Sequence, residues 1–199
     1  MAHARSCPPP PPAWHDAQVA ARKLDQEQWR AVLSSVAAKI SPGAEPARVT
    51  LIGGVAVALG YGTRRTTADA DVAPDVSAEV LRAAEKTAAE FGLPSGWMNT
   101  KAFDAGFVVQ PLQAGKVVLS TPSVVFEIPS TAHLLAMKLS RFAGDTDTED
   151  AKPLLRELRR TYADAEDLWN FLGGLVVVAK RAQARHNLDV LWEMLDESA

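Results

Sequence analysis

The sequence predicts an α/β fold, of the α+β kind, in which a mixed sheet is flanked by helices and followed by a C-terminal helical part. Two observations predict it. In the first two thirds of the chain, short apolar or alternating stretches typical of strands are interspersed with stretches whose apolar residues recur at helical spacing. After Ser130 only the helical spacing remains, so strands and helices mix first and helices follow.

Composition is that of an ordinary globular domain. The chain has 199 residues, of which 47% are hydrophobic and 23% charged, enough for one compact unit. We expect a core over residues 21–145 and a C-terminal helical part of the same unit over 146–199. The net charge of −3 excludes a global basic field for nucleic acid, so any such contact needs a local patch. With Cys7 as the only cysteine, a disulfide framework and a cysteine-rich zinc site are excluded.

The N-terminal stretch contains the run Pro8–Pro12, which fits neither a helix nor a central strand. Residues 1–20 are therefore expected to form a disordered or extended arm. The opening residues lack the apolar centre of a signal peptide. No apolar stretch approaches the roughly 20 residues that span a bilayer. The expectation is a cytoplasmic protein without a membrane partner.

The first helix is expected over residues 26–40. Asp25 is placed to cap it, and Gln28 is placed three residues on to complete a capping box. Apolar residues recur through this stretch at helical spacing, from Trp29 to Ile40. The sequence "SPGAEP" then ends the helix.

Alternating elements follow. Residues 48–52 are expected to form a short buried strand, and the glycine pair Gly53-Gly54 to end it. A brief helix is expected over 55–59, a strand over 67–72, and an amphipathic helix over about 77–91.

The second half of the chain is expected to complete the sheet and then turn helical. The stretches "GFVVQ", "KVVLS" and "SVVFEI" between residues 105 and 128 predict two or three strands, partly antiparallel because their connections are short. Four helices are expected after them, over about 131–143, 149–160, 164–183 and 186–196.

The strand at residues 67–72 carries two carboxylates on one face. Residues two apart in a strand point the same way, so Asp69 and Asp71 project together while Ala70 and Val72 face the core. Two such charges repel unless a cation lies between them. Mg²⁺ takes oxygen ligands and is commonly held by one or two carboxylates plus substrate phosphates. The alternative is an exposed edge strand whose polar face happens to be acidic, since Asp-x-Asp alone is a weak motif.

The glycine pair supplies a second half of the same site. Gly53 and Gly54 follow a buried strand and open a helix. Backbone N–H groups at a helix N-terminus bind phosphate when no side chain is in the way. Together with the carboxylates they predict a nucleotide–Mg²⁺ site. Taken alone, the glycine pair is also explained by a tight turn.

At this point the sequence resembles a known family. The stretch "LIGGVAVALGYGTRRTTADADV" is similar to the signature of the nucleotidyltransferase superfamily: strand, Gly-Gly or Gly-Ser, helix, then Asp-x-Asp. Its "GG" and "R-x-T-x-D-x-D" resemble the AbiE-type and MenT-type toxin nucleotidyltransferases of bacteria. The segments "GWMNTKAF" and "LLAMK…D-x-x-D" are similar to further blocks of related members. The resemblance covers roughly residues 48–158, although the gap between Gly54 and Asp69 is longer than in minimal members.

The resemblance implies a nucleotidyltransferase-like sheet and an Mg²⁺-dependent transfer of a nucleoside monophosphate from an NTP to an acceptor. It implies that the acceptor is the 3′ end of tRNA and that the protein is the toxin of a toxin–antitoxin system, with an antitoxin protein as partner. The residues at matching positions fall into three groups: Asp69 and Asp71 as metal ligands and catalytic groups, Lys138 and Asp150 as further catalytic groups, and Gly53, Gly54, Arg65 and Thr67 at the NTP phosphates.

Lys138 is also unusual by position alone. It lies four residues after Leu134 on the apolar stripe of the expected helix 131–143. A lysine that faces inward is costly unless an anion meets it. The alternative is that its stem runs along the stripe and the ammonium reaches water. If the lysine meets a phosphate, Lys138→Met keeps the apolar stem and is expected to fold normally and still be inactive.

The acidic residues after this helix divide into two kinds. Asp150 shares a helix face with Leu154 and is expected to point inward. Asp147 is explained by the favourable interaction of a carboxylate with a helix N-terminus. Glu127 is the one candidate for a third metal-binding carboxylate, and this question stays open.

Basic residues leave two interpretations open. Arg64 and Arg65 are either a solvated loop pair or a contact to triphosphate or RNA. Basic stretches on the late helices predict either a tRNA patch or a solvated face balanced by acidic residues, the residues being Arg156, Arg159, Arg160, Lys180, Arg181 and Arg185.

Two other functions remain open beside the tRNA-modifying toxin. One is a catalytically silent protein of the same fold that binds or regulates. The other is a nucleotidyltransferase that modifies a protein or a small molecule.

Overall fold

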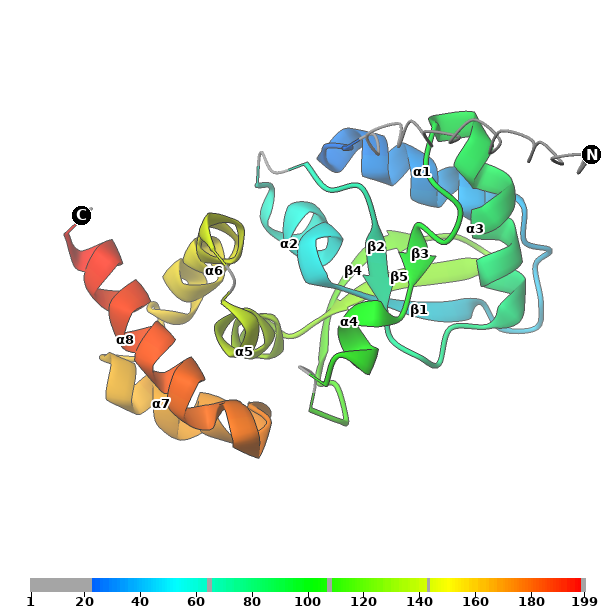
Figure 1. The fold of residues 1–199 in the computed structure, drawn as a ribbon. Helices are drawn as coiled ribbons and strands as arrows, with labels where there is room; N and C mark the ends of the chain where they lie inside the picture. The colour runs from blue at the N-terminus through cyan, green and yellow to red at the C-terminus, as the bar shows by residue number, and fades with distance from the viewer. Residues whose placement is uncertain (1–22, 64–65, 107–108, 143, 198–199) are drawn as a thin grey trace, which may run out of the picture.

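A computed structural model describes residues 23–63, 66–106, 109–142 and 144–197. The proline-rich arm and Arg65 lie outside these residues. Within them, eight α-helices and a five-stranded mixed sheet confirm the predicted α/β class (Figure 1). None of the described helices is both long and apolar enough to cross a membrane.

The elements have the following bounds. The strands are β1 (Ala47–Ile52), β2 (Ala70–Val72), β3 (Met98–Asn99), β4 (Ala114–Ser120) and β5 (Val124–Pro129). The helices are α1 (Gln26–Ala38), α2 (Gly53–Tyr61), α3 (Ala78–Phe91), α4 (Lys101–Asp104), α5 (Thr131–Arg141), α6 (Asp145–Leu158), α7 (Ala165–Leu172) and α8 (Arg181–Asp196).

The sheet has the order β3-β2-β1-β5-β4, with β1 at its centre. β1 runs parallel to β5 and antiparallel to β2, while β4 and β5 are antiparallel. Val49, Leu51 and Ile52 of β1 are fully buried, as the apolar run predicts. The central strand therefore places the start of α2 at one end of the sheet, beside the start of β2.

The first helix forms as predicted. The Asp25 side chain accepts a hydrogen bond from Gln28 N at 2.9 Å, and the Gln28 side chain accepts one from Asp25 N at 3.1 Å. This is the reciprocal capping box. The helix ends at Ala38, two residues earlier than expected, but Ile40 is still buried.

The strand predicted over residues 67–72 is shorter than expected. β2 covers only Ala70–Val72, because the two halves of the stretch pair with different partners. Thr67 forms an isolated antiparallel bridge with Leu24, and each backbone N–H donates to the other residue's carbonyl at 2.8 and 3.1 Å. Asp69 lies between the two paired segments, directly before β2.

Around residue 100 the structure differs from the prediction. The strand β3 and the helix α4 form in "GWMNTKAF", where neither was expected. The described residues of "GFVVQ", namely Gly106, Val109 and Gln110, form no strand. The outer edge of β2 is occupied instead by β3, with Ala70 paired to Met98. A two-residue strand is too short for sequence periodicity to reveal.

The C-terminal helices also begin and end at residues other than those predicted. The helix expected over 149–160 begins at Asp145 and ends at Leu158. The helix expected over 164–183 is wrong as a single element, because α7 ends at Leu172, where Gly173 and Gly174 follow. Glycine is a poor helix former, and two short 3₁₀ turns lead from there to α8.

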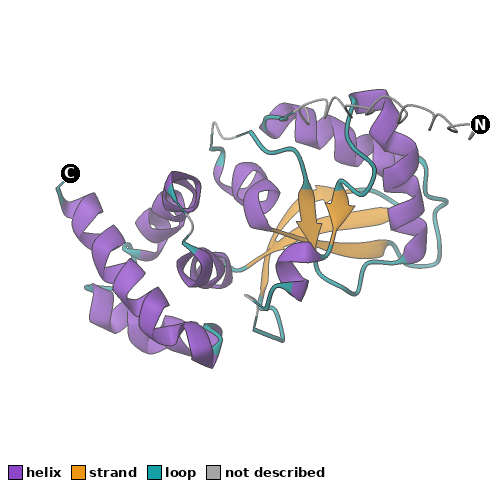
Figure 2. Cartoon of the chain, viewed as in Figure 1, coloured by secondary structure: helices purple, strands orange, loops and turns teal. Residues whose placement is uncertain are grey.

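The C-terminal helices gather beside the sheet around α5 (Figure 2). Asn187 of α8 donates a buried hydrogen bond from Nδ2 to the carbonyl of Leu139 in α5 at 2.7 Å. Leu188 and Leu191 of α8 are fully buried. Because α5 follows β5 directly, it connects the sheet to the helical part and presents its last turn to the end of β1.

Candidate functional site

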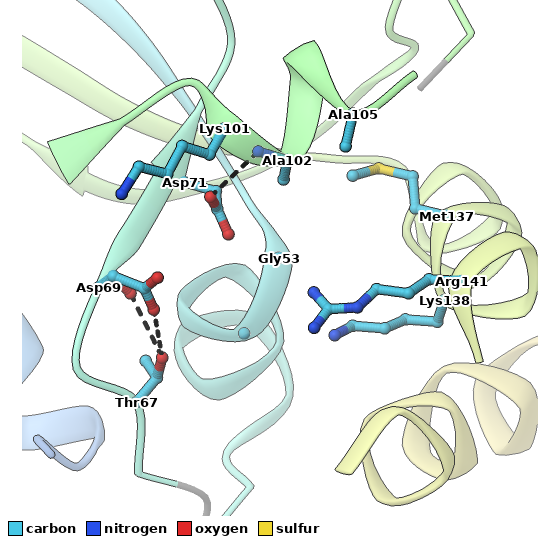
Figure 3. Close-up of a pocket in the computed structure, with 11 residues that line it drawn as sticks. Gly53, Thr67, Asp69, Asp71, Lys101, Ala102, Ala105, Met137, Lys138 and Arg141 are labelled. Atoms are coloured by element: carbon cyan, nitrogen blue, oxygen red, sulfur yellow. Dashed lines mark hydrogen bonds between the residues drawn. The ribbon is translucent and has the colours of Figure 1, made fainter. Parts of the chain in front are cut away.

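A cavity of about 380 Å³ opens where the start of α2, the start of β2, α4 and α5 meet. Figure 3 shows the side chains around it. The lining residues come from four separate parts of the chain: Gly53, Gly54, Thr67, Asp69, Asp71, Lys101, Ala102, Ala105, Met137, Lys138 and Arg141. Six of these are residues that the sequence singled out.

The glycine pair is the first turn of α2 and not the end of the strand before it. Gly53 has φ +67°, and Ile52 before it provides no side-chain cap. A Cβ added at Gly53 would lie 2.7 Å from Asp71 Oδ2. Glycine is therefore favoured by the left-handed backbone, and any Cβ here would displace the Asp71 carboxylate. The first N–H groups of α2 have no partner within the helix and lie at the wall of the cavity.

Replacing Gly53 by alanine tests this close approach. Alanine costs about 1 to 2 kcal/mol in left-handed backbone and would also push the Asp71 carboxylate away. We expect a lower melting temperature and the loss of any activity of the cavity. Gly62→Ala is the matched control, since Gly62 ends the same helix at φ +63° with no atom closer than 3.9 Å to an added Cβ. Equal activity of the two purified variants would contradict the role of Gly53.

The two carboxylates lie on the wall of the cavity across from α5. Asp71 is half-buried, and Asp69 is exposed. Thr67 Oγ1 donates a hydrogen bond to Asp69 Oδ1 at 3.1 Å, and Ala102 N donates one to Asp71 Oδ1 at 3.4 Å (Figure 3). Thr67 and the start of α4 therefore orient the pair. Sequence reasoning gave no role to α4.

The carboxylates interact as like charges. Burial raises the pKa of Asp71, the charge of Asp69 raises it further, and Ala102 N–H, Lys138 and Arg141 lower it. A raised carboxyl pKa means that nearby positive charges and hydrogen-bond donors do not offset the cost of the ionised form. A cation held between the two side chains would provide that compensation.

The donor set fits Mg²⁺ when a substrate supplies the remaining oxygens. Among the described residues, no three His, Cys, Asp or Glu side chains are grouped to hold a metal ion. A pair of carboxylates with phosphate oxygens is a common way of holding Mg²⁺. Because residue 53 is a glycine, no Cβ occupies the space beside Asp71 Oδ2. This side of the carboxylate is therefore accessible to a cation.

Glu127 does not join the pair. It forms an ion pair with Arg48 and accepts a hydrogen bond from Thr50 Oγ1 at 3.4 Å. It is not among the residues that line the cavity. The structure thus places the candidate third carboxylate in a pairing within the sheet.

Lys138 lies on the opposite wall and is buried, with 8% of its side chain exposed. Its Nζ lies 2.6 Å from Asp150 Oδ2 and 3.0 Å from Asp147 Oδ1. The alternative in which the ammonium reaches bulk water is wrong. Asp150 faces inward as expected, with 1% of its side chain exposed. Asp150 does not line this cavity. It contacts Lys138, which does.

Sequence reasoning missed the role of Asp147. It does lie in the first turn of α6, but its side chain is only 3% exposed and is paired with Lys138 and with Arg141. The spacing of Asp147 and Asp150, three residues on a helix, was the signal that the two share a face.

Arg141 was missed as well. It follows Lys138 by three residues, so the two lie on the same side of α5. Its Nε lies 3.4 Å from Asp147 Oδ2, and 57% of its side chain is exposed. Figure 3 shows the guanidinium beside the Lys138 ammonium, both directed across the cavity toward Gly53.

Two of the six basic residues named on the late helices form ion pairs with acidic neighbours. Arg159 forms an ion pair with Asp196, and Arg185 forms ion pairs with Glu166 and Asp189. Of the two open interpretations, the pairing favours a solvated face for these two arginines.

Comparison with known protein families, with curated proteins and with solved structures finds no match to this chain.

Proposed function

We propose that the protein is an Mg²⁺-dependent nucleotidyltransferase that moves a nucleoside monophosphate from an NTP to an acceptor hydroxyl. The observation that carries this proposal is the cavity itself. Carboxylates that suit a divalent cation line one wall together with Lys101, while Lys138 and Arg141 line the other, and the start of a helix with two glycines lies between them (Figure 3). This combination suits a bound polyphosphate.

The residues have distinct roles in this proposal. The N–H groups at Gly53 and Gly54 bind the phosphate oxygens, and Thr67 keeps Asp69 in position. Asp69 and Asp71 would hold Mg²⁺, which supplies positive charge at the phosphates when it is bound. Fixed charges and dipoles of this kind are worth most where charge develops in the transition state.

The transfer conserves atoms and charge. The acceptor oxygen forms a bond to the α-phosphorus, the bond from that phosphorus to the bridging oxygen breaks, and pyrophosphate leaves. The acceptor proton passes to a carboxylate of the pair, which we assign by position to Asp71, the one that lies against the start of α2. The NTP, the tRNA 3′ end as acceptor, the toxin role and an antitoxin partner come from the family resemblance and remain part of this proposal.

The test is incubation of the purified protein with each labelled NTP, Mg²⁺ and total tRNA. We expect transfer of label to tRNA with at least one NTP, and none with Asp69→Asn. Label that appears on a protein or a small molecule would keep the reaction class and change the acceptor. Absence of label on RNA, protein and small molecules with all four NTPs would contradict the proposal.

One observation favours a second function, a catalytically silent module that binds nucleotide. Lys138 is held by two buried carboxylates, an arrangement that also serves as a purely structural cluster. Calorimetric titration with Mg²⁺–NTP beside the transfer assay separates the two functions. Binding without transfer to any acceptor would favour the module.

A further inference from the structure

Within the described residues, the wall of the cavity formed by α5 and backed by α6 contains four charged groups, two positive and two negative; we call it the cation wall. Lys138 and Arg141 carry the positive charges, and Asp147 and Asp150 the negative ones. Both carboxylates are almost completely buried, whereas the two cations differ greatly in exposure, at 8% for Lys138 and 57% for Arg141. Among the described residues these four charges sum to zero, and Arg141 is the member that extends toward solvent.

Lys138 is poorly placed to supply net charge to a ligand. Its ammonium lies within 3.0 Å of oxygens from both carboxylates. A buried cation with two anionic partners contributes little attraction at a distance, because their fields oppose its own. For Lys138 to bind a phosphate in the cavity, these short contacts would have to lengthen.

Arg141 is placed differently. It is the last residue of α5, and Phe142 behind it ends the helix in left-handed backbone at φ 35°. Asp147 meets the guanidinium through Nε, at its stem side. The outer part of the guanidinium points into the space in front of Gly53 (Figure 3). Its donors are therefore presented to the cavity, while a buried carboxylate fixes the side chain from behind.

We infer that Arg141 is the side chain that contacts the phosphates of a bound nucleoside triphosphate, and that Asp147 is its positioning residue. A guanidinium presents a planar fork of donors that matches two phosphate oxygens, and it stays charged at any relevant pH. This inference rests on the proposed function for its ligand class. Its test is independent of transfer, because it uses a polyphosphate without a nucleoside or a metal.

The experiment is calorimetric titration of the whole protein with inorganic tripolyphosphate in the presence of EDTA. We expect Arg141→Met to weaken binding about ten- to hundredfold, the value of charged hydrogen bonds to one side chain. Arg141→Lys keeps the charge but loses the planar fork of donors. Its affinity for tripolyphosphate should therefore lie between those of the wild type and Arg141→Met. Arg48→Met is the matched control, since Arg48 is 62% exposed, is paired with one carboxylate and lies outside the cavity. It should bind as the wild type does.

The Asp147→Asn variant tests whether Asp147 acts on phosphate binding by positioning Arg141 or only through its negative charge. Removing a carboxylate makes the wall more positive and by charge alone would tighten tripolyphosphate binding. If Asp147 positions Arg141, binding should instead weaken, and the losses of Asp147→Asn and Arg141→Met should fail to add in the double variant. Tighter or unchanged binding by Asp147→Asn would overturn the positioning role.

Two results would overturn the phosphate assignment. One is no detectable binding of tripolyphosphate by the wild type at millimolar concentration, and the other is wild-type affinity in Arg141→Met. If Arg141→Met loses binding while the wild type transfers no label to any acceptor, the phosphate contact stands and the proposed transferase activity fails.

Discussion

Asp69→Asn and Asp71→Asn are each expected to lower nucleotide transfer at least about a hundredfold, as the loss of a charged group at the reacting phosphates does. Asparagine keeps the shape of the side chain but removes the negative charge that would hold Mg²⁺. The measurement is the transfer rate at saturating NTP. Asp75→Asn is the matched control, since Asp75 is exposed just beyond β2 and should retain full activity.

The same variants should not destabilise the protein in the absence of metal. The pKa of Asp71 is raised above its ordinary value of 3.8, first by burial and then by Asp69. Between 3.8 and the raised pKa the folded state binds more protons than the unfolded state, so stability falls as pH rises through this window. Above the window the ionised carboxylate costs stability, and Asp71→Asn removes that cost. A metal-free melting temperature several degrees below wild type would show that the pair is structural.

Lys138→Met is expected to destabilise the protein by about 3 to 5 kcal/mol, the cost of removing one partner from a buried ion pair. The expectation from sequence, that this variant folds normally, is corrected here. Methionine fills the space of the lysine stem, but it leaves Asp147 and Asp150 buried without the cation that lies within 3.0 Å of both. The measurement is the free energy of unfolding from denaturant titration.

A rescue variant tests whether Lys138→Met loses stability because of unpaired charge or because of altered packing. Adding Asp147→Asn and Asp150→Asn to Lys138→Met removes both buried negative charges and should recover most of the lost stability. If Lys138 takes part in the reaction, the triple variant should be less active than the Asp147→Asn, Asp150→Asn double variant, which loses the same support of Arg141. A Lys138→Met protein with wild-type stability would contradict the buried cluster, and equal activity of the triple and double variants would make Lys138 purely structural.

Patterns within one segment were read correctly from the sequence. The capping box of Asp25 and Gln28 is a local arrangement of four residues, so it forms wherever the helix does. The apolar stripe of α5 placed Lys138 on the inward face, because periodicity reports which side of a helix is buried. The inward direction of Asp150 follows from the same kind of argument.

Contacts between segments could not be predicted from the sequence. The sequence assigned Asp147 to the helix N-terminus alone, since nothing in α6 indicates that α5 brings Lys138 and Arg141 against it. Arg141, read in isolation, is an exposed arginine at a helix end. The strand β3, with two residues, and the helix α4, with four, were missed because each covers only about one period of its pattern, too little for a repeat to be seen.

The sequence by itself determined the α/β class, the glycine pair at a helix start, the paired carboxylates and the inward lysine. Each is set by the local rules of backbone geometry and burial. Only the tertiary structure decided that these features meet at one cavity, that a side chain at Gly53 would displace the Asp71 carboxylate, and that two buried carboxylates hold the lysine. The physical reason is that charge pairing and steric approach depend on distances between segments, and those distances are set by how the sheet and its helices pack.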